Sequence, residues 1–332
     1  QTAERCIEAV SRFDFSAMGI KEPVRLSAGM AYASGTDTEI LHNLPKQADV
    51  AMYHAKRPGK KKIALFEQSM FSRTNILYSN SINNLVFKAL EDDESIEMHY
   101  QPITNLNTGK VNYYEALVHI RNGVSLIMPS TIFPLIEERR LEAEFDLVIL
   151  RQIARDIELG KIPAGSGVSF NVSGMGVMDK AVQEKIHSLA AYIPRYKLII
   201  EVTETALITQ LQLASSILNT LRQKGFLIAL DDFGSGYSSL SYLSSMPVDC
   251  IKFDISLTRQ LLEGSRQSII IGSLATMALK AGYILTADGV ETEEMLNKIN
   301  EIGFNYGQGF LLGQPENTCH ESAGAPYFNH KK

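Results

Sequence analysis

The sequence contains no tryptophan and only three cysteines, Cys6, Cys250 and Cys319, among its 332 residues. Because the cysteines are odd in number, far apart and without zinc-ligand spacing, we expect reduced thiols in a reducing compartment. No apolar run approaches the roughly 20 residues that cross a bilayer, and the first residues lack a signal-peptide pattern. These absences predict a cytoplasmic chain without membrane contact of its own, or the cytoplasmic portion of a membrane-anchored parent.

Positive charge is also in short supply, since 32 Lys and Arg face 37 Asp and Glu, for a formal net charge of −5. A mildly acidic chain is a poor binder of nucleic acid polymers by bulk electrostatics. An anionic small ligand would therefore need local help from Lys, Arg, backbone amides or a metal. With 45% hydrophobic residues and no low-complexity run, the composition is that of a folded protein with a sizeable core.

The chain divides by pattern into a small first unit, a linker and a larger domain. Residues 1–68 predict a helix over 3–13, a strand over 24–33, and a further helix and strand over 44–66. A unit this small buries little on its own, so it is expected to be part of a domain. Residues 69–95 predict a linker helix, residues 96–318 a second domain, and residues 319–332 a tail.

From residue 96 onward, short apolar segments alternate with helical segments. Alternating strands and helices over about 225 residues predict an α/β fold, a (βα)8 barrel of the TIM type. The first two segments are separated only by TNLNTGK, which favours a hairpin and therefore one antiparallel strand in the barrel. The predicted strands are IEMHYQPI (96–103), VNYYEALVHI (111–120), GVSFNVS (167–173), KLIIEVTE (197–204), LIALDD (227–232), DCIKFD (249–254), YILTADGVE (283–291) and GQGFLLG (307–313).

Polar side chains follow most of these strands at the point where each strand ends. In a barrel, the carboxyl ends of the strands converge on one mouth, where such enzymes carry their chemistry. A single acid there is more often a helix N-cap or a surface group, so the repetition at barrel spacing carries the argument. The residues are Glu115, Asn171, Glu201, Asp231, Asp232, Lys252, Asp288, Glu291 and Gln308.

Several carboxylates in one mouth would raise one another's pKa values unless a cation compensates them. Ligand sets made only of oxygen suit Mg²⁺ or Mn²⁺ rather than zinc. The adjacent Asp231 and Asp232 suit two metal ions about 3.5–4 Å apart, an arrangement that clamps the attacking and leaving oxygens of phosphodiester hydrolysis. Lys252 adds a positive charge for the negative charge that develops in that reaction.

At these residues the sequence resembles the EAL family of cyclic di-GMP phosphodiesterases, over about Leu85 to Pro315. The motifs appear in the family's order along the whole of that stretch. They are YQPI (100–103), YEAL (114–117), FNVS (170–173), EVTET (201–205), DDFGSGYSSLSYLSSMPVDCIKFD (231–254), ADGVET (287–292) and GQGF with LLGQP (307–315).

The resemblance implies hydrolysis of cyclic di-GMP to linear pGpG, with two Mg²⁺ or Mn²⁺ ions and a homodimer formed through this domain. It implies that Glu204 anchors the loop from Phe233 to Ser239, which supports dimerisation and metal binding in relatives. The other implied roles follow by group. The metal ligands are Glu115, Asn171, Glu201, Asp231 and Asp232; the catalytic residues are Lys252, Asp288 and Glu291; the substrate-binding residues are Gln101, Leu117, His119, Arg121 and Gln308.

Two positions depart from the family's pattern. Relatives usually carry glutamate where this chain has Asp288, and the shorter side chain loses one methylene of reach. Relatives also commonly carry an arginine, aimed at a ligand phosphate, where this chain has His119, and histidine lacks the bidentate fork. Arg121, two residues further along the same strand, could take over part of that role, while His119 could equally be a core histidine.

The first unit resembles the last third of a GGDEF (diguanylate cyclase) domain, through VRLSAGMAYA (24–33) and ADVAMYHAKRPGKKK (48–62). The signature loop of that family is absent, so no diguanylate cyclase activity is expected from this fragment. Three functions stay open for the larger domain. They are an active phosphodiesterase, a non-catalytic receptor that binds cyclic di-GMP and signals to a protein partner, and a scaffold with neither property.

Overall fold

The computed structural model describes residues 80–123, 125–204, 211–234 and 246–320, together with 27–32, 63–67 and a few other positions among the first 55. The chain separates into two compact units, Gln1–Asn84 and Leu85–Lys332. In the first unit, β1 (Ala28–Met30) pairs in parallel with β2 (Ile63–Leu65). Most of the other elements predicted for this unit lie outside the described residues.

The described part of the predicted linker forms helix α4 (Asn80–Glu91), followed by a short 3-10 turn, η2 (Asp93–Ser95). Asp92 begins that turn, and its side chain accepts a hydrogen bond from the backbone N–H of Glu94. Val86 and Ala89 of α4 are buried. Residues 69–79 of the predicted linker are outside the described part of the chain.

The second unit is built on a closed barrel of eight strands, ordered β3-β11-β10-β9-β8-β7-β6-β4 and closed by pairing of β3 with β4. Strand β3 runs antiparallel to both neighbours, whereas the other neighbouring pairs are parallel. The predicted barrel and its single antiparallel strand are thereby confirmed. The strands are β3 (Ile96–Asn105), β4 (Val111–Asn122), β6 (Gly167–Asn171), β7 (Lys197–Thr203), β8 (Leu227–Phe233), β9 (Cys250–Phe253), β10 (Ile284–Ala287) and β11 (Tyr306–Gly307).

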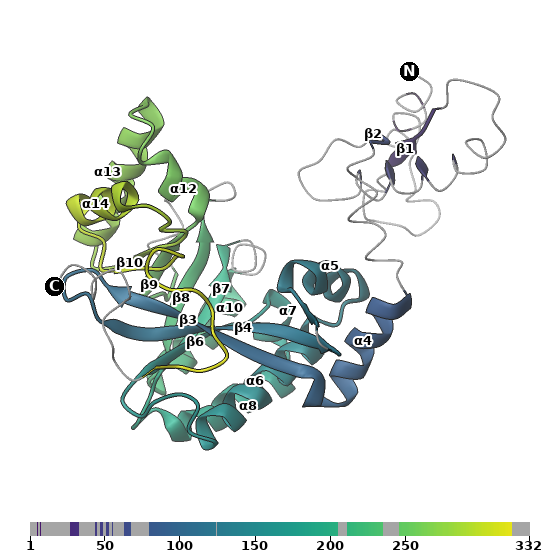
Figure 1. Ribbon diagram of the computed structural model, residues 1–332, viewed down its shortest axis with the longest axis horizontal. Helices are drawn as coiled ribbons and strands as arrows, with labels where there is room; N and C mark the ends of the chain where they lie inside the picture. Colours follow the sequence, from purple (N-terminus) through teal and green to yellow (C-terminus); the bar gives the residue numbers. More distant parts are fainter. Residues whose placement is uncertain are drawn as a thin grey trace. The chain divides into compact units, whose positions relative to one another are not determined.

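Helices cover the outside of this barrel and return the chain to the start of the next strand (Figure 1). Helix α6 shows why they pack there, because Phe145, Ile149 and Ile153 recur at helical spacing and are all buried. The remaining helices are α5 (Pro129–Arg139), α6 (Glu142–Glu158), α7 (Gly174–Met178), α8 (Lys180–Leu189), η3 (Ala190–Tyr192), α10 (Leu211–Gln223), α12 (Ile255–Gln260), α13 (Arg266–Lys280) and α14 (Glu293–Ile302).

The structure departs furthest from the predicted strands in two places. Strand β5 (Ser125–Ile127) was not predicted; it pairs antiparallel with β4 and lies outside the closed ring. The last predicted strand, 307–313, contains only the end of β11, and the chain then turns. Gly309 explains this turn, because its φ of 151° favours glycine and a Cβ there would lie 2.3 Å from the backbone of Val290.

The barrel interior changes from apolar to polar over a single step along its strands. Five buried side chains pack together in the lower interior: Ile103, Tyr113, Ile199, Ala229 and Cys250. Side chains alternate along a strand, so the residue two positions nearer the mouth faces the same interior. Those next residues are all polar or charged: Gln101, Glu115, Glu201, Asp231 and Lys252.

Candidate functional site

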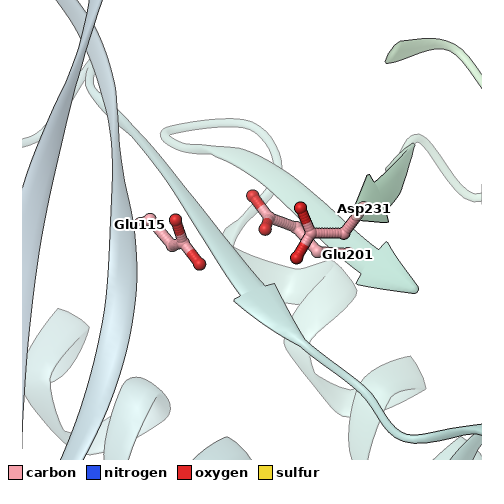
Figure 2. A group of neighbouring side chains, drawn as sticks. All are labelled: Glu115, Glu201 and Asp231. Atoms are coloured by element: carbon pink, nitrogen blue, oxygen red, sulfur yellow. The ribbon is translucent and has the colours of Figure 1, made fainter. Parts of the chain in front are cut away.

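Three carboxylates from three different strands meet inside the barrel mouth. Glu115 comes from β4, Glu201 from β7 and Asp231 from β8. One carboxylate oxygen of each lies within 4.8 Å of the others, and Figure 2 shows the three groups gathered together. Glu201 is fully buried, Glu115 is buried and Asp231 is partly exposed. Such a group of acids needs a positive charge nearby to remain ionised.

Lys252 supplies part of that charge from the neighbouring strand β9. Its Nζ lies 3.0 Å from Glu115 Oε2, 2.6 Å from Glu201 Oε2 and 3.3 Å from Asp231 Oδ1. Burial lowers the pKa of Lys252, but the three carboxylates raise it by more, so that this pKa lies well above its usual value. One lysine thus faces three acids, and the group has an excess of negative charge.

Beside this excess of negative charge, the pKa values of Glu115 and Glu201 shift in opposite directions. Burial raises the pKa of Glu115, but Lys252, Gln308 and Asn171 together bring that pKa below its ordinary value. Burial and repulsion by Glu115 hold the pKa of Glu201 well above its ordinary value. Within the described residues, Oε1 of Glu201 is buried and has no hydrogen-bond partner. A buried acceptor without a donor, beside two further carboxylates, fits coordination of a hard cation such as Mg²⁺ or Mn²⁺.

Side-chain amides complete the interior of the mouth. Asn171 Nδ2 donates to Glu115 Oε1 at 3.0 Å, and Gln308 Nε2 donates to Glu115 Oε2 at 2.6 Å. The Gln308 amide also donates to Gln101 Oε1 at 2.9 Å, and Gln101 in turn donates to the carbonyl of Gly313 at 3.2 Å. Because the NH₂ group of Asn171 is committed to Glu115, its Oδ1 is the atom of this side chain that can ligate a cation.

Two predicted acids lie near this group without joining it. Asp232 is exposed and has a φ of 53°, an uncommon conformation for a residue other than glycine. Asp288 follows β10 and accepts a hydrogen bond from the N–H of Gly289 at 2.6 Å. Partial desolvation of its carboxyl group, followed by repulsion from Asp231, raises the pKa of Asp232 to about 6. Burial with repulsion from Glu115 raises that of Asp288 to about 6.

The hairpin of β3 and β4 forms one wall of the mouth above the acids. His119 is buried, and its ring lies over that of His99 with centroids 4.3 Å apart. Arg121 is paired with Glu97, and Glu97 also contacts His99 Nε2 at 3.0 Å. Glu97 and His99 were not predicted, although cross-strand pairing with His119 and Leu117 could have identified them.

The remaining predicted site residues lie around this centre. Glu204, which is buried, accepts a hydrogen bond from the N–H of Gly234 at 3.3 Å, at the start of the loop that it was expected to anchor. Residues 235–245 of that region lie outside the described chain. Glu291 is exposed and paired with Arg259 of α12 at 2.9 Å. Leu117 is half-buried and pairs across the hairpin with His99.

A family model described as EAL domain matches residues 84–315, about the extent of the barrel unit. The chain belongs to the EAL domain family. This EAL chain is 30% identical over 324 residues to the bifunctional diguanylate cyclase/cyclic di-GMP phosphodiesterase MucR of Pseudomonas aeruginosa, covering 94% of this chain and 46% of MucR. It is also 30% identical over 310 residues to the cyclic di-GMP phosphodiesterase NbdA of the same organism, covering 89% of this chain and 39% of NbdA.

The barrel of the EAL domain also matches solved structures. That of the PaMucR phosphodiesterase in complex with c-di-GMP is 28% identical with a TM-score of 0.64, covering 71% of this chain and 97% of that chain. The EAL chain spans less than half the length of the curated relatives MucR and NbdA. None of its described helices has the length and apolar character needed to cross a membrane.

Proposed function

We propose that this EAL domain hydrolyses cyclic di-GMP to linear pGpG with two divalent cations, Mg²⁺ or Mn²⁺. The observation that carries the proposal is the group of Glu115, Glu201 and Asp231 beside Lys252, with an unpartnered oxygen of Glu201 among the described residues. Relatives MucR and NbdA are cyclic di-GMP phosphodiesterases by name. The acidic mouth suits a phosphodiester substrate because its acids can hold cations, and those cations offset the negative charge of the substrate phosphate.

In this proposal Glu115, Asn171, Glu201, Asp231 and Asp232 hold the cations. When bound, the cations would compensate the acids, polarise the phosphate and lower the pKa of the attacking water. That water loses a proton and adds to one phosphorus atom, and the bond from phosphorus to the 3′ oxygen breaks. The 3′ oxygen takes up a proton and leaves as a hydroxyl group, and a 5′ phosphate remains.

The chain's own residues then act on the reacting phosphate. Lys252 Nζ, fixed by three carboxylates, faces the negative charge that grows on the phosphate oxygens. Asp288, with a pKa of about 6, can accept a proton from the attacking water at neutral pH. Glu291 is assigned to the same step by resemblance, and it pairs with Arg259 of α12 at 2.9 Å.

Substrate binding is assigned to the wall and floor of the mouth. Gln101 and Gln308 fix each other by a hydrogen bond of 2.9 Å and would hold the sugar-phosphate ring above the acids. Leu117 and His119 offer an apolar and an aromatic surface to the ligand. Arg121 would contact the second phosphate after separating from Glu97, its present partner.

Product analysis tests this function. Purified chain, cyclic di-GMP and Mg²⁺ or Mn²⁺ should yield pGpG by chromatography, and excess chelator should stop its formation. A binding titration with cyclic di-GMP is run beside it. Absence of both product and binding, with and without metal, would contradict the proposal. A protein-interaction scaffold would then be the remaining function.

A receptor without turnover is the second candidate, and Asp288 is the observation that favours it. The carboxylate of Asp288 is not part of the compact group formed by Glu115, Glu201 and Asp231 in the described chain. His119 also lacks the fork with which an arginine would clamp a phosphate. Tight binding of cyclic di-GMP without product in the same experiment would establish this alternative.

Cation binding by the mouth should depend on pH, with Asp288 as a reporter. Its pKa rises from 3.8 to about 6 on folding, so the folded chain binds a proton that the unfolded chain releases. Without metal, this contribution to stability is present below pH 3.8 and is lost as the pH rises through about 6. A cation held by the neighbouring acids favours the ionised form of Asp288, so Mn²⁺ should stabilise the barrel more at pH 7.5 than at pH 5.

Thermal unfolding measures this difference directly. At about 100 times the dissociation constant, a bound ion adds about 2.7 kcal/mol, which corresponds to a rise in Tm of roughly 5–10 °C for a domain of this size. We expect that rise at pH 7.5 and less than half of it at pH 5, each against a chelator control. Equal shifts at both pH values would contradict a cation held by these acids.

We further infer that residues 1–68 are the C-terminal part of a GGDEF-like domain, joined by residues 69–95 to the EAL domain at 96–318. The support is the alignment with MucR, which covers 94% of this chain, and the parallel pairing of β1 with β2. By family resemblance the proposal also includes a homodimer formed through the EAL domain and a cytoplasmic location. Analytical ultracentrifugation of the purified chain would test the dimer.

A further inference from the structure

A buried carboxyl group lies just outside the barrel, beside the connection between α7 and β6, the strand that carries Asn171. Asp146 of α6 is 5% exposed, and its Oδ2 accepts hydrogen bonds from Ser173 N at 3.0 Å and from Ser173 Oγ at 2.7 Å. Burial raises the pKa of Asp146 to about 7, although the two bonds from Ser173 lower it. Burying a carboxyl group costs free energy unless hydrogen bonds compensate for the lost water. The two bonds from Ser173 provide that compensation here.

Ser173 connects that carboxyl group to the end of β6 at the barrel mouth. It lies two residues after Asn171 and caps α7, since its Oγ accepts from the N–H of Gly176 at 2.9 Å. Gly176 packs so tightly that a Cβ there would lie 1.9 Å from Asp146 Oδ2. Between these two points, the N–H of Val172 donates to the carbonyl of Glu201 at 2.9 Å.

Asn171 is therefore held from three directions. Its side chain donates to Glu115 at 3.0 Å. Val172, the next residue, is hydrogen-bonded to β7, and Ser173, the one after it, is hydrogen-bonded to Asp146. A metal ligand must keep its oxygen within about 0.5 Å of the productive position. Loss of the Asp146 contact would free the backbone directly after Asn171 while leaving the strand itself paired with β7.

We propose that Asp146 is a positioning residue for the cation site, which acts through Ser173 to fix the side-chain oxygen Oδ1 of Asn171. This inference rests on the proposed function, because it takes Asn171 as a metal ligand. Asp146 touches neither cation nor substrate; its effect is on the geometry of a residue that does. Groups that orient a ligand in this way commonly change metal affinity by 10–100-fold when removed.

The chain offers a matched control on the same helix. Asp156 of α6 is also fully buried, but its carboxylate accepts from Tyr100 Oη at 2.6 Å and from Gln152 Nε2 at 2.9 Å, and pairs with Lys161. None of these partners belongs to the connection between β6 and α7. Asp156→Asn therefore removes a buried charge from α6 without touching Ser173.

The test is Mn²⁺ binding measured by calorimetry in the absence of substrate, first on the intact chain. Asp146→Asn should raise the Mn²⁺ dissociation constant about tenfold or more. Asp156→Asn should change it less than twofold, even if both variants lose similar thermal stability. Ser173→Ala should weaken Mn²⁺ binding in the same direction, and Ser173→Thr, which keeps the hydroxyl group, should restore it.

A double-variant cycle separates positioning from general loosening of the fold. In an Asn171→Ala background, Asp146→Asn should weaken Mn²⁺ binding less than threefold, because the residue that it positions is already gone. A full tenfold effect in that background, or none in the intact chain, overturns the inference. If the Asp146→Asn variant does not fold, the Mn²⁺ dissociation constants of Ser173→Ala and Ser173→Thr decide instead, and no weakening by Ser173→Ala overturns the inference. Failure of the unaltered chain to bind Mn²⁺ instead overturns the proposed function, and is seen before any variant is made.

Discussion

Asp231→Asn should abolish hydrolysis of cyclic di-GMP while leaving the barrel folded. The substitution keeps the size of the side chain but removes one of the three charges that meet beside Lys252, whose Nζ is 3.3 Å from Asp231 Oδ1. We expect kcat/KM to fall by about 10³-fold or more, equivalent to roughly 4 kcal/mol of lost transition-state stabilisation. Steady-state kinetics with saturating Mn²⁺ and thermal unfolding of both proteins give the two readouts.

The control for this variant is Asp249→Asn at the opposite end of the barrel. Asp249 comes just before β9 and accepts hydrogen bonds from Arg222 and from the N–H of Ile228, so it contributes to folding and not to the mouth. Its replacement should lower Tm and leave kcat/KM within about threefold of the unaltered chain. An Asp231→Asn protein with full activity would rule out the metal role assigned to Asp231.

Asp288→Glu should raise hydrolysis about tenfold or more, or create it if the unaltered chain turns over too slowly to detect. Asp288 lies near the acidic centre, where burial raises its pKa, Lys252 lowers it and Glu115 raises it. Its carboxylate is outside the compact group of ligand oxygens in the described chain. One added methylene extends the carboxylate by roughly 1.5 Å. That reach is larger than the tolerance of about 0.5 Å that a catalytic centre allows.

Asp288→Asn is the companion variant, because it removes the charge without adding reach. It should lower any existing turnover and leave binding of cyclic di-GMP largely intact. A gain in turnover by the glutamate variant alone would show that side-chain length limits this site. No change in the glutamate variant would remove the argument that position 288 favours a receptor.

The barrel and the core of its mouth could be predicted because both follow from periodicity. Strand alternation fixes which side chains point inward, and parallel strands must end at the same mouth. Glu115, Glu201 and Asp231 are brought together by those two rules, as is Lys252 from the next strand. The hairpin prediction for TNLNTGK succeeded for a local reason, since Asn105 accepts from the backbone N–H groups of Asn107 and Thr108 and so closes the turn.

Other features depend on contacts between distant residues, and the sequence pattern does not encode them. Strand β11 ends early because Gly309 meets the backbone of Val290, nineteen positions away in sequence. The ion pair of Glu291 with Arg259 joins a loop to helix α12, and no periodicity relates the two. In the sequence, Asp146 is one polar residue of an amphipathic helix, and its contact with Ser173 forms only when α6 packs against α7.

The most direct test of the central claim is a single-turnover reaction of the chain with cyclic di-GMP in water enriched in oxygen-18. If the acidic mouth hydrolyses a phosphodiester bond, linear pGpG should form with Mg²⁺ or Mn²⁺ and carry one labelled oxygen on its 5′ phosphate. The chelator control should return unlabelled cyclic di-GMP. Metal-replete chain that binds cyclic di-GMP and returns it intact would contradict the phosphodiesterase and leave the receptor as the function of this EAL domain.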